Sequence, residues 1–220
     1  MDRVSRRARF EQVDIYPVTC ERLSAGRSNL EVLEGIIRGG ARIVQLREKE
    51  ASKRELYHLA VKFRGMTEQA GILLMINDHL DIALAVGADG VHLGQDDLPL
   101  RAARNLAPEL IIGASTHSLQ EALEAQGEGA DYVNIGPIFP TRTKEGVERF
   151  LGPEAIVDIG PKLEVPFTVM GGIAGSNIDE VLARGARRVA MVSAITQAVD
   201  IAETVRSLRE RIRNYPPAGR

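Results

Sequence analysis

Short apolar runs alternate with amphipathic stretches along almost the whole chain. In the amphipathic stretches, such as residues 28–40 and 52–71, apolar residues recur every three or four positions, which predicts helices. The apolar runs are short, rich in Val and Ile, and bounded by turn residues, which predicts strands. Eight strands are expected, at residues 14–20, 42–48, 72–78, 90–94, 110–116, 132–138, 166–172 and 188–194.

A Gly-Ala pair separates an expected helix from the strand that follows it at four places: Gly40-Ala41, Gly87-Ala88, Gly129-Ala130 and Gly185-Ala186. A glycine at this point predicts a left-handed C-cap, which lets the chain turn sharply into the next strand. The repetition indicates repeated αβ units within one domain.

Strands that are apolar on both faces and alternate with helices indicate a parallel sheet covered by helices. Eight such units in 220 residues match the count and size of a closed barrel. The predicted fold class is therefore α/β, a single-domain (β/α)8 TIM barrel at residues 13–213. A doubly wound sheet is the alternative, but no G-x-G-x-x-G turn follows the first strand. The basic arm at residues 1–12 is expected to be solvated, and residues 214–220 to form a frayed tail.

Composition excludes several classes of protein. The chain is 44% hydrophobic and 26% charged, with a net charge of −2, so bulk charge gives no reason to expect nucleic-acid binding. No apolar stretch approaches the roughly 20 residues that span a membrane, and we expect a cytoplasmic protein with no membrane partner. The single cysteine, Cys20, excludes an internal disulfide. A homo-oligomer is compatible with all of this.

The polar residues after the second strand form an alternating set. Gln45, Arg47 and Lys49 occupy alternate positions, so an extended chain directs all three toward the barrel mouth, while Val44 and Leu46 face the helices. In such barrels the C-terminal strand ends carry the active site. The alternative is a charged turn in solvent, which explains the neighbouring glutamates but not Gln45, because Gln45 lies inside the apolar run.

Acidic and amide groups end the third and fourth strands, at Asn77-Asp78 and at residues 95–97. Adjacent loops would bring Asp78 and Asp97 together, and two such carboxylates repel unless a proton or a cation lies between them. Mg²⁺ suits a site with one or two carboxylates plus substrate phosphates. Asp97 could instead be the N-cap of a helix that begins at Leu98-Pro99. Asp96 is expected to be solvated.

The remaining strand ends are rich in hydrogen-bond donors. Ser115 and Thr116 could cap the next helix or donate to a ligand, and spacing does not separate these roles. The loop with Thr141, Thr143 and Lys144 is typical of an anion site. The last two strand ends, with their glycines and helix starts, occupy the usual phosphate site of this fold. Two anion sites, one with a metal, indicate a transferase that releases diphosphate from one of two phosphorylated substrates.

These strand ends together resemble the thiamine-phosphate synthase (thiamine-phosphate pyrophosphorylase) family. The resemblance runs from Tyr16 to Asp200 and rests on "QLREK", "INDHLDIALAVGADGVHLGQDDLP", "GAST", "GPIFPTRTK", "GGI" and "MVSAI". It implies a transferase that joins 4-amino-2-methyl-5-hydroxymethylpyrimidine diphosphate to a thiazole phosphate, giving thiamine monophosphate and diphosphate. The implied reaction is dissociative, with Mg²⁺ assisting the departure of diphosphate. His79 and Met170 depart from the usual family pattern, which puts local packing in doubt.

The resemblance also implies roles for individual residues. Mg²⁺ would bind Asp78 and Asp97. The residues expected to act in catalysis are Arg47, Lys49, Ser115 and Lys144. The pyrimidine diphosphate would contact Gln45, Leu46, Arg47, Glu48, Lys49, Asn77, Ser115 and Lys144. The thiazole phosphate would contact Thr141, Arg142, Thr143, Gly172, Val192 and Ser193.

Other functions are possible on the same barrel. A thiazole tautomerase resembles the synthase but lacks its metal and diphosphate groups, whereas Asp78, Asp97 and the "TRTK" loop are present here. A non-catalytic barrel that binds thiamine precursors would be favoured if those residues were missing. A phosphosugar isomerase or epimerase would explain the phosphate site but would leave "QLREK" without a role.

Overall fold

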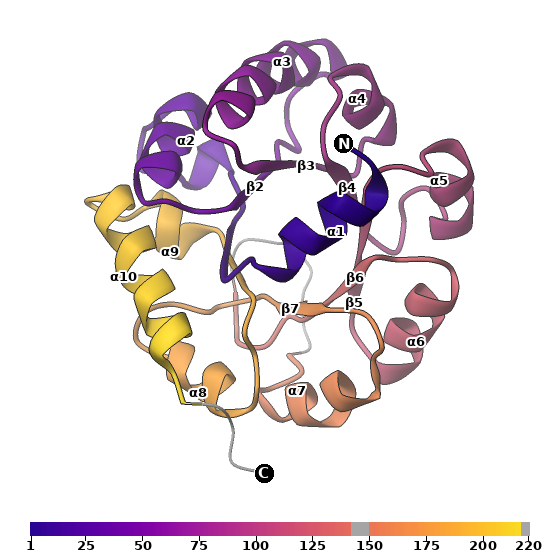
Figure 1. Ribbon diagram of the computed structural model, residues 1–220. Helices are drawn as coiled ribbons and strands as arrows, with labels where there is room; N and C mark the ends of the chain where they lie inside the picture. Colours follow the sequence, from indigo (N-terminus) through magenta and orange to yellow (C-terminus); the bar gives the residue numbers. More distant parts are fainter. Residues whose placement is uncertain (142–149, 217–220) are drawn as a thin grey trace.

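The computed structural model describes residues 1–141 and 150–216 as eight parallel strands that alternate with helices (Figure 1). Each expected strand is present, and each is shorter than the apolar run that predicted it. The strands are β1 Ile15–Pro17, β2 Ile43–Leu46, β3 Leu73–Asn77, β4 Gly90–Leu93, β5 Ile111–Thr116, β6 Tyr132–Ile135, β7 Phe167–Val169 and β8 Val189–Met191.

The strands close into a barrel, as predicted. Their order in the sheet is β1-β8-β7-β6-β5-β4-β3-β2, so β1 and β2 lie at its two ends. A parallel bridge between Val18 and Gln45 joins those ends, and the Thr19 N–H donates to the Gln45 carbonyl at 2.9 Å. Closure leaves no open strand edge, and it brings the loops that follow all eight strands to one mouth.

The helices form a ring around the barrel (Figure 1). Capping boxes begin two of them, at Ser28 with Glu31 and at Ser52 with Glu55, which satisfies backbone N–H groups of the first turn. No helix among residues 1–141 and 150–216 has the length and apolar character needed to cross a membrane. The ring helices are α2 Asn29–Arg38, α3 Lys53–Gln69, α4 Leu80–Ala85, α5 Leu100–Leu106, α6 Leu119–Gly127, α7 Glu154–Ile159, α8 Ile178–Ala183, α9 Ser193–Thr196 and α10 Ile201–Asn214, with short 3-10 turns at Glu21–Leu23 and Gly160–Lys162.

The four Gly-Ala pairs turn the chain from helix to strand as the sequence predicts. Each glycine has a positive φ, from 63° at Gly87 to 97° at Gly129. Each following alanine donates its N–H to the carbonyl five residues earlier, as Ala41 does to Ile36, which is the bond of a Schellman motif. All four alanines are buried, so each corner is also a packing contact.

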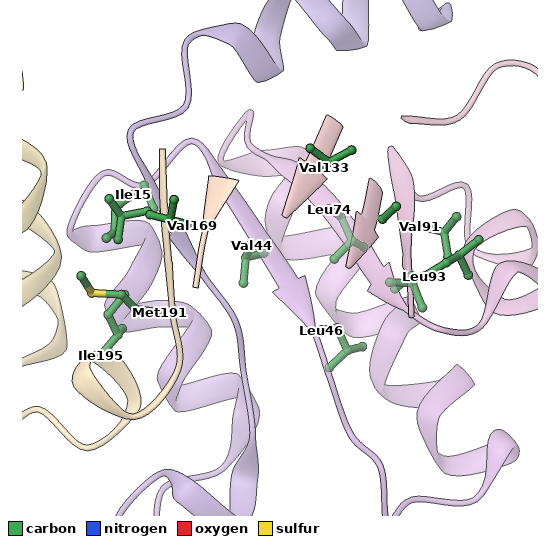
Figure 2. Close-up of a cluster of buried hydrophobic side chains, with 14 of the residues drawn as sticks. Ile15, Val44, Leu46, Leu74, Val91, Leu93, Val133, Val169, Met191 and Ile195 are labelled. Atoms are coloured by element: carbon green, nitrogen blue, oxygen red, sulfur yellow. The ribbon is translucent and has the colours of Figure 1, made fainter. Parts of the chain in front are cut away.

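Buried side chains form two clusters, one on each face of the barrel wall. The larger lies between strands and helices, and Figure 2 shows part of it, with Val44 and Leu46 on β2 and Leu93 on β4. Alternate residues of the same strands, such as Ile43 and Met75, form the second cluster inside the barrel. The predicted orientation of β2 is therefore confirmed: Val44 and Leu46 face the helices, and Gln45 faces the interior.

The basic N-terminal arm forms a helix that packs on the barrel, although most of its residues remain exposed as its composition predicts. Residues Arg3–Glu11 form helix α1, which crosses the centre of the ring of helices (Figure 1). Its last turn inserts Phe10, 2% exposed, against Tyr16 and Tyr132 inside the barrel. The arm thus closes the barrel at the end opposite the mouth. Composition does not reveal this contact, because it depends on a single apolar residue, Phe10.

Two buried carboxylates at the start of strands hold α1 in place. Asp131, before β6, accepts from Arg3 Nε at 2.8 Å and from Arg104 Nη2 at 2.5 Å. Asp89, before β4, lies 3.5 Å from Arg6 Nε. The positive charge that made the arm look solvated therefore pairs with acids at the closed end of the barrel.

Close contact between α2 and α10 depends on a glycine, and replacing Gly35 with alanine is expected to destabilise the fold. A Cβ at Gly35 would lie 2.7 Å from Ile201 Cβ, well inside van der Waals contact. Overpacking of this kind costs about 1–3 kcal/mol in the free energy of unfolding, measured by urea titration. The control is Gly65→Ala in α3, where a Cβ meets open space; there, helix propensity predicts a gain of about 0.5–1 kcal/mol. Equal effects of the two changes would contradict this account.

Candidate active site

Polar residues gather at the mouth of the barrel, where strands β2 to β5 end. Gln45 on β2 is 3% exposed, and its Nε2 donates to the Tyr16 hydroxyl at 2.9 Å. Asn77 ends β3 and pairs in register with His92 of β4. Ser115 near the end of β5 is half-buried. The structure thus brings together the three strand-end residues predicted to bind the pyrimidine side.

The loop after β2 directs alternate side chains to different places. Lys49 reaches across to the end of β3, where its Nζ lies 2.7 Å from Asp78 Oδ2. Arg47 lies toward β1, with its backbone N–H donating to Thr19 Oγ1 at 3.2 Å. Both side chains remain partly accessible, so both cations can meet an anionic ligand at the mouth.

Two other members of the predicted set, Leu46 at the end of β2 and Glu48 in the loop, have structural contacts. The Leu46 side chain is fully buried in the cluster under the helices. Glu48 accepts from the Glu21 N–H at 2.7 Å and from Asn29 Nδ2 at 2.9 Å. These contacts fasten the loop to the start of α2, and the Glu48 carboxylate is already engaged there.

Asp78 and Asp97 meet at the mouth, as the sequence predicts. Asp78 has a left-handed backbone with φ of 61°, which is rare for a residue with a side chain. Its N–H donates to the His92 carbonyl at 2.8 Å, and this bond holds the unusual conformation. Strain of this kind is typical of functional positions.

Asp97 is not the N-cap of the following helix, the role proposed as its alternative. Helix α5 begins at Leu100, with Pro99 at the cap position. The Asp97 carboxylate instead turns back and accepts from the Gly94 N–H at 2.6 Å. Partial burial raises the pKa of the Asp97 carboxyl, and the Asp78 carboxylate beside it raises that pKa further, while the Gly94 N–H and Lys49 act in the opposite direction. The two acids therefore share one site.

Replacing Asp97 with asparagine is expected to separate stability from activity. A raised carboxyl pKa means that the folded protein favours the neutral group, so at neutral pH the charge on Asp97 opposes folding. Asparagine removes that charge and can still accept from Gly94. We expect the metal-free variant to unfold at an equal or higher temperature than the wild type, and its turnover to fall by about 100-fold. A variant that is clearly less stable without metal would contradict repulsion between Asp78 and Asp97.

The donor set around Asp78 and Asp97 suits a hard cation with few protein ligands. Within the described residues no group of three or more His, Cys, Asp or Glu side chains is placed to hold a metal ion. Two carboxylates that repel each other, with Lys49 as a nearby counter-charge, match instead a cation that takes its remaining ligands from phosphate and water.

A chain of hydrogen bonds crosses the barrel interior beneath these residues, and the sequence did not reveal it. Gln45 Nε2 bonds to the Tyr16 hydroxyl, Tyr16 to the Tyr132 hydroxyl, Tyr132 to His92 Nδ1, and His92 Nε2 to Ser115 Oγ, each at 2.9 Å. Burial lowers the pKa of His92 to about 4, so the imidazole is neutral. Burial also raises the pKa of both tyrosines. One signal was available: a tyrosine inside a barrel needs a partner for its hydroxyl.

The structure excludes one of the two roles considered for Ser115 and Thr116, that of a helix cap. Helix α6 is capped by Ser118, whose side chain accepts from the Glu121 N–H. Thr116 is fully buried, and its Oγ1 donates to the Asn134 carbonyl at 3.0 Å. Neither residue caps the helix, and Ser115 alone faces the site.

The loops after β7 and β8 lie where the phosphate site is expected. Gly171 and Gly172 both have positive φ, and a Cβ at Gly172 would collide with the Pro140 carbonyl, so the loop after β7 packs closely on the loop after β6. Asn177 holds the turn by accepting from the Ala174 N–H and donating to the Gly172 carbonyl.

The other residues predicted for this side fall in two groups. Val192 and Ser193 stand at the start of α9, where backbone N–H groups have no partner within the helix. Thr141 is half-buried beside the Pro140 segment. Arg142, Thr143 and Lys144 lie outside the described residues.

Sequence comparison gives the same picture as the geometry. Residues 15–195 match the model of a family described as Thiamine monophosphate synthase. A thiamine-phosphate synthase from Pelotomaculum thermopropionicum is 46% identical over 90% of this chain and 91% of its own length. One from Dictyoglomus thermophilum is 42% identical over 98% of this chain and 97% of its own length.

Solved structures agree in fold. A thiamine phosphate pyrophosphorylase from Pyrococcus furiosus superposes with a TM-score of 0.86 at 37% identity, covering 95% of this chain and 98% of that one. A 3-hexulose-6-phosphate synthase, at 18% identity and a TM-score of 0.65, shares the barrel alone. With the family match spanning most of the barrel and relatives above 40% identity over nearly the whole length, this chain belongs to the thiamine monophosphate synthase family.

Proposed function

We propose that this transferase joins 4-amino-2-methyl-5-hydroxymethylpyrimidine diphosphate to a thiazole phosphate, giving thiamine monophosphate and diphosphate. The observation that supports this most is the meeting of Lys49, Asp78 and Asp97, from three consecutive strand ends, at one mouth. A metal-assisted diphosphate site needs this combination of two acids and a cation. A phosphate site alone would not.

The proposal assigns a task to each side of the mouth. Asp78 and Asp97 would hold Mg²⁺, which when bound supplies positive charge to the leaving diphosphate. Lys49 and Arg47 would neutralise the remaining charge, because preorganised cations stabilise the charge that develops as the bond to the leaving group breaks. Lys144 would act with them, although it lies outside the described residues.

The opposite side of the mouth would hold the second substrate. The Gly171-Gly172 turn and the start of α9 present backbone N–H groups to a monophosphate. Diphosphate would depart first and leave a pyrimidine-methyl cation, which the thiazole nitrogen would then capture. The chain's residues would bind and orient both reactants and supply few proton transfers.

The two substrates and Mg²⁺ provide a direct test. Purified protein is incubated with pyrimidine diphosphate and thiazole phosphate, with and without Mg²⁺, and thiamine phosphate is measured by chromatography. We expect product only when both substrates and the metal are present. Folded protein that forms no product would refute the synthase, and conversion of one thiazole phosphate tautomer to another without condensation would identify a tautomerase. The cytoplasmic location and any homo-oligomer remain predictions, which cell fractionation and light scattering test.

A further inference from the structure

We infer that the buried chain from Gln45 to Ser115 is a one-way hydrogen-bond relay that fixes Ser115 Oγ as a donor toward the substrate, which makes Tyr132 and His92 positioning residues. This inference rests on the proposed function, because it concerns how Ser115 meets the pyrimidine diphosphate. The inference assigns the donor and the acceptor of each hydrogen bond in the chain.

The direction follows from counting protons. Gln45 Nε2 can only donate, so the Tyr16 oxygen accepts from it. Among the described residues Tyr16 has one other partner, the Tyr132 hydroxyl. Tyr16 is 1% exposed, so its own proton must go to Tyr132, because a buried donor without an acceptor costs about 1–3 kcal/mol.

The same reasoning continues to Ser115. Tyr132 accepts from Tyr16 and therefore donates to His92 Nδ1. A neutral imidazole that accepts at Nδ1 carries its proton at Nε2, and this proton goes to Ser115 Oγ. The serine oxygen is thereby an acceptor from within the barrel, and its hydroxyl proton is available at the mouth.

The chemistry of the substrate favours this direction over its reverse. The reverse direction requires the Gln45 amide to flip, so that its oxygen accepts from Tyr16. Ser115 would then donate its hydroxyl proton to His92. The serine would then present only lone pairs to a diphosphate, whose oxygens are themselves acceptors. An anionic substrate is bound by donors, so the forward direction gives the productive site.

Two contacts hold Tyr132 at the middle of the relay. The Phe10 ring of α1 stacks on the Tyr132 ring with centroids 4.3 Å apart and planes at 26°. On β5, Gly113 leaves the space that the ring fills, because a Cβ there would collide with the Tyr132 ring atoms. The tyrosine therefore cannot rotate away from His92 without opening the closed end of the barrel.

The tautomer of His92 tests the direction without any substrate. The chain has only four histidines, so 15N labelling of histidine and long-range 1H–15N NMR can assign each ring. We expect His92 to be protonated at Nε2 in the wild type and in Ser115→Ala, and to lose this preference in Tyr132→Phe. Protonation at Nδ1 in the wild type would overturn the relay, whether or not the protein is a synthase.

A double-mutant cycle tests the effect on the substrate. Ser115→Ala and Tyr132→Phe are each expected to lower kcat/KM for the pyrimidine diphosphate by about 10-fold to 100-fold, the range for one hydrogen bond to a charged group. The double variant should show no larger decrease in kcat/KM than either single variant, and KM for the thiazole phosphate should be unaltered. Effects that multiply would overturn the relay. Thr168→Val, which removes another buried hydroxyl in the barrel, is the matched control and should multiply with Ser115→Ala.

Discussion

Replacing Asp78 with asparagine is expected to lower turnover by about 100-fold or more, the cost typical of one preorganised electrostatic group. The change removes one of the two carboxylates proposed to hold Mg²⁺ and also releases Lys49, whose Nζ lies 2.7 Å from Asp78. Asparagine is preferred to alanine because it tolerates the left-handed backbone at this position, where φ is 61°. The measurement is kcat over a range of Mg²⁺ concentrations, with both substrates saturating.

A neighbouring acid provides the control for Asp78. Asp96 is exposed and belongs to the same pair of loops, so Asp96→Asn removes an equal charge without touching the site. Its turnover should stay close to that of the wild type. If Asp78→Asn kept a near-native rate at saturating Mg²⁺, the assignment of this carboxylate to the leaving-group side would be wrong.

Replacing Asp131 with asparagine is expected to lower the free energy of unfolding by about 3–5 kcal/mol, as when one partner of a buried ion pair is removed. The carboxylate is almost fully buried between Arg3 and Arg104, and it also accepts from the Ile112 N–H at 2.9 Å. The Arg104 guanidinium and the Ile112 N–H both bond Oδ2, whereas Arg3 bonds Oδ1. An asparagine that keeps its oxygen in the Oδ2 place therefore turns its amide group toward the Arg3 cation, and the negative charge shared by both arginines is lost. Urea unfolding of the metal-free protein measures the loss.

An exposed ion pair is the control for Asp131. Asp179 binds Arg211 through both oxygens on the surface, where water screens the charges. Asp179→Asn should change the unfolding midpoint little. Similar losses for the two variants would show that burial does not strengthen the contact between α1 and the barrel.

The repeating fold and most of the mouth could be predicted because they depend on local patterns. The Gly-Ala corners follow from the backbone freedom of glycine, and the alternation around Gln45 follows from the pleat of a strand. Both signals lie within a few residues. Once the strand count indicated a barrel, the meeting of Asp78 and Asp97 followed from strand order.

Contacts between distant segments could not be predicted in this way. Phe10 gave no sign that it packs on Tyr132, since neither is near the other in sequence. The role of Asp97 depended on whether its carboxylate turned toward α5 or toward Gly94, and the sequence allows both. Glu48 shared the alternating loop with Lys49, yet its contact with Asn29 belongs to a different element.

Helix α1, at the closed end of the barrel, lies outside the residues that match the family model. Residues 15–195 match the family, whereas the closed barrel also includes Phe10 and the arginines of α1. A protein trimmed to the matched residues would keep every group at the mouth and yet expose Tyr16 and Tyr132 to water and leave Asp131 without Arg3. The segment that the family model delimits is thus shorter than the segment that folds, and truncations should be planned from the second.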